Sequence, residues 1–139
     1  MARGGPEALA DVPLFGGLAK RHLRHIAGLT EEESFPEGAT LAEEGKSGET
    51  FHIMLEGEAR VTRSGRRINR LIPGDFFGEI ALIDAGPRTA SVVAETPVTT
   101  LTIDRKRFMK MLEEDPSIVV AMLEELAKRL RNNERSLTG

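Results

Sequence analysis

The sequence predicts an α+β fold in which a β-jelly-roll barrel lies between short N-terminal helices and two C-terminal helices. Two patterns indicate this. Apolar residues recur at helical spacing near both ends of the chain, whereas residues 34–103 contain short runs of Val, Ile, Leu, Thr and Phe broken by Gly and Pro. Helical and strand-like segments are therefore separated along the chain, which is typical of α+β folds and not of alternating βαβ units.

The N-terminal part predicts little regular structure before residue 19. Gly and Pro are frequent in residues 1–8, so we expect this stretch to be loose. The apolar segment 9–15 contains a proline and predicts one turn of helix. Residues 19–29 predict a helix, because its apolar residues lie near helical spacing with basic residues between them. Its two histidines, His22 and His25, have no Cys or acidic cluster nearby, so we expect a solvated face and no metal site.

The middle of the chain predicts a barrel or jelly roll, since several short strands follow one another at close, even spacing. The candidate strands are 40–43, 51–55, 58–63, 67–72, 91–95 and 98–103. Ser64-Gly65 predicts a tight hairpin, because Gly accepts positive φ. Four further glycines are interpreted as turn residues without a role in ligand binding: Gly38, Gly45, Gly48 and Gly57.

Two helices are predicted after the barrel. Asp104 can cap a helix over 105–114, and Asp115-Pro116 marks a second start, with Asp as the cap and Pro in the first helical position. The second helix runs to about 134 and carries a wide apolar stripe, so it needs packing to be stable. The C-terminal helices together cover about 104–136, and residues 1–139 are predicted to form one domain.

Composition restricts the possible functions. The chain has 139 residues, 40% of them hydrophobic and 29% charged, which fits one globular domain. The net charge of −3 argues against nucleic-acid binding by this chain alone, and the lack of Cys excludes disulfides and thiolate metal sites. The sequence contains no run of about 18 apolar residues, so it predicts no membrane span. No signal-peptide pattern opens the chain, so we expect a cytoplasmic protein.

The stretch 73–90 interrupts the strand pattern and carries the candidate chemistry. Gly78 opens one or two predicted helical turns over 79–83, whose free backbone N–H groups suit an anion. Arg88 arrives just before the next strand, and its guanidinium fork can grip two phosphate oxygens. Glu79 does not help to bind a phosphate, but it can accept a hydrogen bond from a sugar hydroxyl. The pattern therefore points to a nucleotide with a ribose.

These residues resemble the cyclic-nucleotide-binding domain family. The phosphate-binding cassette of that family is similar to Phe77-Gly78-Glu79-Ile80-Ala81-Leu82, followed after a short gap by Arg88-Thr89-Ala90-Ser91-Val92. The glycine framework of the family is matched by Phe35-Pro36-Glu37-Gly38, Leu41, Gly45, Gly48, the run from Phe51 to Gly57, Ala59 and Val61. The similarity covers residues 10–136, nearly the whole chain.

The resemblance implies a regulatory sensor in which capture of cyclic AMP, favoured over cyclic GMP, moves the last helix. It also implies that Arg88 pairs with the phosphate and that Glu79 accepts the ribose 2′-hydroxyl. Thr89 can bond the phosphate or the base, so it does not settle which base is bound. Backbone N–H groups would complete the phosphate and sugar cradle, and two barrel residues would contact the purine. The whole predicted ligand site is Gly78, Glu79, Ile80, Ala81, Arg88, Thr89, Ala90, Val61 and Leu71.

Two other functions remain open. The first is a protein-interaction module on the same fold that no longer binds nucleotide, although the intact Glu79 and Arg88 count against it. The second is a metal enzyme on a jelly-roll barrel, which would need several His ligands, whereas His52 is the only histidine of the barrel. We therefore expect no enzyme, no metal site and no cofactor; the ligand is cyclic AMP or, alternatively, cyclic GMP.

Two surfaces are candidates for a partner. The apolar stripe of the last helix is a packing face, and it can also serve as a lid or as the seam of a homodimer or effector complex. Arg129, Asn132 and Asn133 are candidates for touching the base from this lid. The predicted hairpin carries a basic cluster, which is either a solvated edge that blocks strand association or a patch for a partner. The cluster is Arg60, Arg63, Arg66, Arg67 and Arg70.

Overall fold

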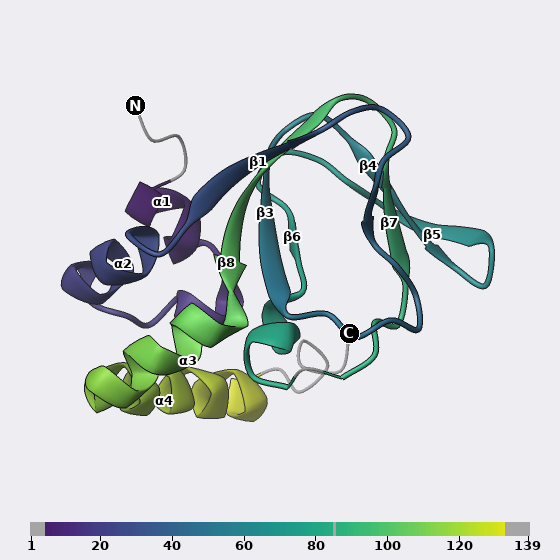
Figure 1. Ribbon diagram of the computed structural model, residues 1–139. Helices are drawn as coiled ribbons and strands as arrows, with labels where there is room; N and C mark the ends of the chain where they lie inside the picture. The colour runs from purple at the N-terminus through teal and green to yellow at the C-terminus, as the bar shows by residue number, and fades with distance from the viewer. Residues whose placement is uncertain (1–4, 85, 133–139) are drawn as a thin grey trace. The chain divides into compact units, whose positions relative to one another are not determined.

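Residues 5–84 and 86–132 are described by a computed structural model, drawn in Figure 1. The chain divides into two compact units. One covers residues 29–109 and contains the strands; the other combines residues 1–28 and 110–139 and is helical where it is described. The predicted α+β class with a jelly-roll barrel is confirmed, whereas one domain over 1–139 stays a prediction.

The strand unit consists of two antiparallel four-stranded sheets. The first has the order β1 (Glu31–Phe35), β8 (Val98–Asp104), β3 (Thr50–Glu56) and β6 (Phe76–Phe77). The second has the order β2 (Thr40–Ala42), β7 (Ser91–Ala94), β4 (Ala59–Arg63) and β5 (Arg66–Leu71). The chain passes repeatedly from one sheet to the other, as Figure 1 shows, and this encloses an interior between them.

All six predicted strands are present with bounds shifted by no more than one residue, but β1 and β6 were missed. β1 begins at Glu31, three residues before the predicted barrel. Its sequence, Glu-Glu-Glu-Ser-Phe, lacks apolar alternation, and residues 31–34 are all exposed. It is held as a strand by pairing with β8, in which Glu31 lies opposite Thr102 and Phe35 opposite Val98. A tertiary partner thus overrides weak local propensity.

The barrel core is small and aliphatic. Met54 of β3 and Val98 of β8 come from one sheet, and the other members come from the second sheet or its neighbourhood. The buried cluster is Ala42, Met54, Ala59, Leu71, Val92, Ala94 and Val98, with Phe35, Leu41, Val61 and Phe77 packed against it. Two predicted purine contacts, Val61 and Leu71, are therefore members of this core or packed on it.

The β4–β5 hairpin turns where it was predicted. Ser64 and Gly65 both have positive φ, 53° and 79°, as a two-residue hairpin turn requires. Strand β5 is at the edge of its sheet, and a bulge interrupts its pairing with β4 after Val61. Charged edges and bulges both discourage strand addition.

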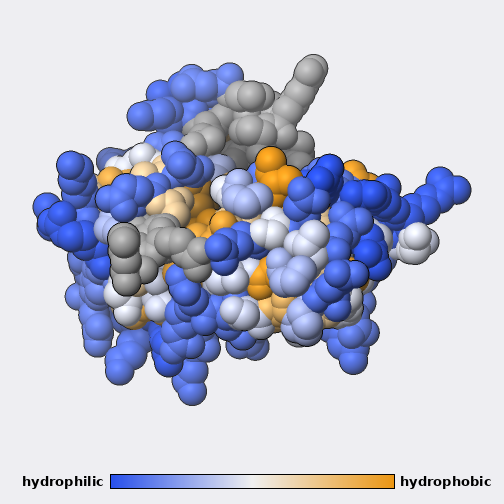
Figure 2. All heavy atoms as spheres, turned by 90° about the horizontal axis from the view of Figure 1, so that it is seen from above, coloured by the Kyte–Doolittle hydropathy of each residue, from blue (hydrophilic) through white to orange (hydrophobic). Residues whose placement is uncertain are grey.

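Two arginines of this hairpin form ion pairs with glutamates of the same unit. Arg67 pairs with Glu95 at 3.1 Å, and Arg70 pairs with Glu58. These pairs favour the solvated-edge interpretation. Figure 2 shows a face of the molecule that is mostly hydrophilic, with hydrophobic residues exposed between polar ones.

The helical unit begins earlier than predicted. Helix α1 (Gly5–Ala10) occupies part of the stretch that was expected to be loose, and its Leu9 is fully buried. A turn of 3-10 helix, η1 (Pro13–Phe15), and helix α2 (Lys20–Ala27) follow as predicted. Burial of one apolar face thus orders a segment that Gly and Pro alone would leave loose.

The C-terminal helices start at the predicted signals. Helix α3 (Arg105–Glu114) is capped by Asp104, whose Oδ1 accepts the Lys106 N–H at 2.6 Å. Helix α4 (Pro116–Asn132) follows Asp115 directly. Of the three lid candidates, Asn133 and the side chain of Arg129 lie outside the described residues. No helix within the described ranges is both long and apolar enough to cross a membrane.

The expectation of a solvated His22 is wrong. His22 is buried, and its Nε2 lies 3.2 Å from Ser117 Oγ and 3.9 Å from Asp115 Oδ2 at the start of α4. Ser117 donates a hydrogen bond to Asp115, and this bond is the main reason that the pKa of Asp115 lies below its usual value. His22 was misassigned because its neighbour in space is 95 residues away in the sequence.

Candidate functional site

The segment after β5 folds back into the barrel before it forms the predicted short helix. Gly74 N–H donates to Met54 O and Met54 N–H donates to Asp75 O, so two backbone hydrogen bonds join this turn to β3. Gly78 then takes φ +84°, a conformation that favours glycine, and the 3-10 helix η2 (Glu79–Leu82) follows. The predicted helix over 79–83 is therefore present but short. Its four residues can carry only a small dipole, so the preference for an anion must rest mainly on Arg88.

The backbone at Arg88 is joined to the loop between β2 and β3. Arg88 N–H donates to Lys46 O, and Gly45 N–H donates to Arg88 O, both at 2.8 Å. A bridge between Ser47 and Pro87 extends this pairing. The two segments are about forty residues apart in sequence, so their pairing is a product of the tertiary fold.

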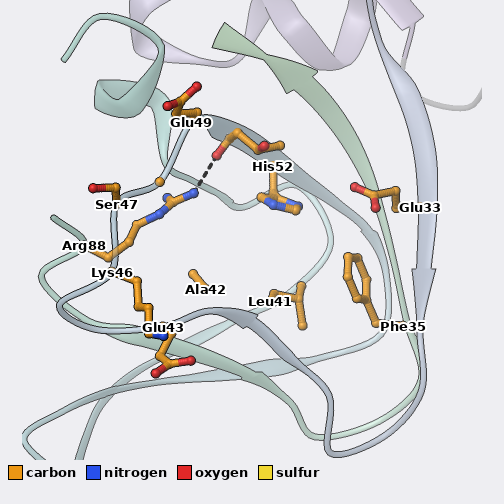
Figure 3. Close-up of a pocket in the computed structure, with 12 residues that line it drawn as sticks. Glu33, Phe35, Leu41, Ala42, Glu43, Lys46, Ser47, Glu49, His52 and Arg88 are labelled. Carbon is orange, nitrogen blue, oxygen red and sulfur yellow. Dashed lines mark hydrogen bonds between the residues drawn. The ribbon is translucent and has the colours of Figure 1, made fainter. Parts of the chain in front are cut away.

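The Arg88 side chain crosses this loop and ends beside Gly78. Its Nη2 donates to Thr50 O at 2.8 Å, shown as the dashed line in Figure 3. A Cβ on Gly78 would lie 2.6 Å from Arg88 Nη1. The structure therefore brings together two residues of the predicted site, Gly78 and Arg88.

Arg88 carries a charge that no described side chain neutralises. No carboxylate among the described residues forms an ion pair with it, and its hydrogen bond goes to a neutral carbonyl. Partial burial lowers the pKa of the guanidinium, but an arginine remains protonated in proteins. A half-buried cation without a counter-ion is a favourable site for an anion, because burial weakens competition from water.

A cavity of about 310 Å³ lies next to this guanidinium. Figure 3 shows Arg88 reaching from one side, with His52, Leu41 and Phe35 also placed around the space. Apolar residues line part of it, and charged residues of both signs surround the rest. The lining residues are Glu33, Phe35, Leu41, Ala42, Glu43, Lys46, Ser47, Gly48, Glu49, Thr50, His52 and Arg88.

His52 is held firmly in this cavity wall. Its ring stacks on Phe77 with centroids 4.6 Å apart and planes 8° from parallel, and its Nδ1 lies 3.1 Å from Thr100 Oγ1. Burial, and next the positive charge of Arg88, lower the pKa of His52 to about 4. The imidazole is therefore neutral near pH 7, and it offers the cavity a hydrogen-bonding group without adding charge.

This shift predicts a specific loss of stability in acid. The unfolded chain takes up the His52 proton as pH falls below about 6.5, whereas the folded protein resists protonation until about pH 4. The free energy of unfolding should thus fall by up to about 3 kcal/mol between pH 7 and pH 4 through this group. Urea unfolding of the wild type and His52→Gln across this range measures the difference. The exposed His25→Gln is the control, and a parallel pH profile for wild type and His52→Gln would contradict the prediction.

Among the described residues, Arg88 is the one member of the predicted site that lines the cavity. Ala81 is buried in η2, and Thr89 is exposed, with its carbonyl accepting a hydrogen bond from Arg63 Nε at 3.1 Å. Glu79 is half-buried, and the side chain of Ile80 lies outside what the structure describes. The ligand roles of Gly78, Glu79, Ile80, Ala81, Arg88, Thr89, Ala90, Val61 and Leu71 stay predictions.

Sequence reasoning missed the part of the cavity that comes from β1 and the β2–β3 loop. Gly48 and His52 were both noticed, but Gly48 was interpreted as a turn residue, and His52 was considered only as the single histidine of the barrel. Glu33 and Lys46 gave no signal at all, because isolated charged residues are normally surface residues. Only the antiparallel pairing of distant strands places them at one cavity.

Known proteins share this architecture. The family model described as cyclic nucleotide-binding domain matches residues 32–115. A CRP-like cAMP-activated global transcriptional regulator of Mycobacterium tuberculosis is 30% identical over 136 residues, covering 94% of this chain and 61% of that protein. A cAMP-dependent protein kinase regulatory subunit of Aspergillus fumigatus is 37% identical over 106 residues, covering 75% of this chain and 26% of that protein.

A crystal structure of the N-terminal domain of a transcriptional regulator from Streptomyces coelicolor superimposes with a TM-score of 0.82 at 28% identity, covering 93% of each chain. The chain thus spans less than two thirds of the length of these two curated relatives, and nearly the whole of this solved domain. The family model, the sequence relatives and the shared fold agree. The chain belongs to the cyclic nucleotide-binding domain family.

Proposed function

We propose that this chain is a regulatory sensor that binds a cyclic nucleotide, cyclic AMP in preference to cyclic GMP, and that it has no catalytic role. The observation that carries the proposal is the uncompensated Arg88 guanidinium beside a cavity of about 310 Å³. A cyclic nucleotide presents one negative charge on its phosphodiester, which is a counter-ion that the described residues do not supply to Arg88. The preference for cyclic AMP is supported by the two curated relatives, whose names describe cAMP activation and cAMP dependence.

The individual contacts to the nucleotide are assigned from the resemblance to the family's phosphate-binding cassette. Arg88 binds the equatorial phosphate oxygens, and Glu79 accepts the ribose 2′-hydroxyl. Backbone N–H groups near Gly78, Ala81 and Ala90 complete the cradle. Thr89 supplies a hydroxyl for the phosphate or the base, while Val61 and Leu71 offer apolar surface to the purine. Leu71 belongs to the buried barrel core and Val61 packs against it, so a purine placed against this core would meet apolar surface.

The output is movement of the last helix, α4, and α3 links that helix to the site. The start of α3 touches both parts of the site, because Arg105 N–H donates to Glu49 O at 2.8 Å and Arg105 Nη2 donates to Ile83 O at 3.4 Å. A ligand that shifts the cassette relative to the β2–β3 loop will therefore change the environment of the first turn of α3. The ligand must bind one helix position more tightly than the other to produce a signal.

Isothermal titration with cyclic AMP and cyclic GMP, run in parallel, tests the proposal. We expect saturable binding of about one nucleotide per chain, with the lower Kd for cyclic AMP. A thermal-shift assay covers the case in which the binding enthalpy is near zero. No heat and no thermal shift with either nucleotide would support the alternative, an interaction module without a nucleotide. Tighter binding of cyclic GMP would overturn only the base preference.

We also propose that α4 forms a homodimer seam. Four of its exposed residues, Val120, Leu123, Ala127 and Leu130, are spaced by three, four and three residues, which is the a/d pattern of a coiled coil. The exposed fractions of Val120, Leu123 and Leu130 are 55%, 61% and 53%. An apolar stripe at this period fits a second helix, and another copy of the chain supplies the same stripe.

Leu123→Glu should weaken this dimer at least tenfold, because each copy loses a buried leucine worth about 1.5–3 kcal/mol and gains a charge at the seam. Sedimentation equilibrium gives the dimer dissociation constant. Lys128→Glu changes an exposed residue of the same helix away from the stripe and serves as the control. A wild-type chain that stays monomeric at about 100 μM would have a dimer Kd well above that concentration, and this would reject the seam and leave an effector protein as the occupant.

A further inference from the structure

Two glycines of the β2–β3 loop differ in what they face. Gly45 has φ +85° and open space where a Cβ would be, so it is a turn glycine. Gly48 does not adopt the left-handed region that would require glycine, and it is buried. A Cβ on Gly48 would lie 1.7 Å from Arg88 Nε, 2.3 Å from Cζ and 2.6 Å from Nη2. Gly48 is therefore needed for the space that Arg88 occupies and not for a turn.

A second glycine also lies close to this guanidinium. A Cβ on Gly78 would lie 2.6 Å from Arg88 Nη1 and 2.7 Å from Thr50 O. The Arg88 side chain thus has a glycine close to each of two parts of its guanidinium, Gly48 at Nε and Nη2 and Gly78 at Nη1, and its end is anchored by the 2.8 Å bond to Thr50 O. We name this feature the glycine slot, formed by Gly48 and Gly78 around Arg88.

We propose that Gly48 is a positioning residue for Arg88, and that the glycine slot holds the guanidinium ready for a phosphate before the nucleotide arrives. The inference rests on the proposed function for its consequence in binding. Its physical basis is preorganisation, since a side chain that is already fixed loses less freedom when the ligand binds. A methyl group at position 48 has no room unless the Arg88 side chain leaves its place. Because that side chain is the flexible partner, the fold can survive the change while the anion site is displaced.

Gly48→Ala should therefore weaken binding of cyclic AMP about tenfold, the order expected for loss of one fixed, rotamer-rich side chain. The matched control is Gly86→Ala, which adds the same methyl two residues before Arg88 at a position with nothing within 4 Å of the new Cβ. We expect the control to bind within about twofold of the wild type. Titration calorimetry measures both variants.

A double-mutant cycle separates positioning from a general structural role. Gly48→Ala is measured alone and in the Arg88→Ala background, by urea unfolding without nucleotide. Positioning predicts that the methyl shifts the unfolding midpoint when Arg88 is present and has little effect when Arg88 has been removed. An equal shift in both backgrounds would mean that the methyl disturbs the loop itself, and would overturn the inference.

The outcomes distinguish the two proposals. Binding by the wild type with unchanged affinity of Gly48→Ala would overturn the positioning role and leave the sensor function intact. Failure of the wild type to bind any cyclic nucleotide would reject the proposed function. The unfolding cycle then decides the glycine slot by itself, because it needs no ligand.

Discussion

Replacing Arg88 by alanine should lower the affinity for cyclic AMP by about 30- to 150-fold, the largest expected effect on binding. The change removes a charged hydrogen-bonding partner of the phosphate, worth about 2–3 kcal/mol. In this variant Thr50 O loses the hydrogen bond that Arg88 donates to it in the wild type, but Thr50 O is neutral, so no unpaired buried charge remains. Calorimetric titration with cyclic AMP measures the loss directly.

Two further variants make this result specific. Arg66→Ala removes an exposed arginine of the β4–β5 hairpin and should leave affinity unchanged, although it alters net charge by the same amount. Arg88→Lys keeps the charge but not the planar fork, so its affinity should lie between those of the wild type and Arg88→Ala. Equal affinity of Arg88→Ala and the wild type would rule out Arg88 as the phosphate ligand.

Phe51→Ala should cost about 3–5 kcal/mol of the free energy of unfolding, the largest expected effect on stability. Phe51 is fully buried in β3, and its ring packs against Phe76 with centroids 6.0 Å apart. Removing it leaves a cavity between the strand and its neighbours. Urea denaturation monitored by circular dichroism measures the change.

Ile68→Ala is the matched control for this core substitution. Ile68 is 48% exposed at the bulge of β5, so its truncation should change stability by less than about 0.5 kcal/mol. A loss at Phe51 no larger than that at Ile68 would contradict the packing described for β3.

Local sequence patterns were sufficient to predict most of the helices and strands. Alternation and turn residues identified the six predicted strands, and Asp104 and Asp115-Pro116 marked the starts of α3 and α4. These features could be predicted because they depend on neighbours within a few residues. Strand β1 could not, since its glutamates favour no strand by themselves and only the ladder with β8 orders them.

The sequence by itself determined the family, a barrel segment preceded and followed by helices along the chain, and the short segment that carries Gly78, Glu79 and Arg88. The tertiary structure decided what surrounds them. It placed Gly48 against Arg88, made His52 a neutral part of the cavity wall, and buried His22 against the start of α4. The physical reason is the same in each case. A residue's charge state and the space beside it depend on atoms that are distant in sequence, and only the packing of strands and helices brings those atoms within contact.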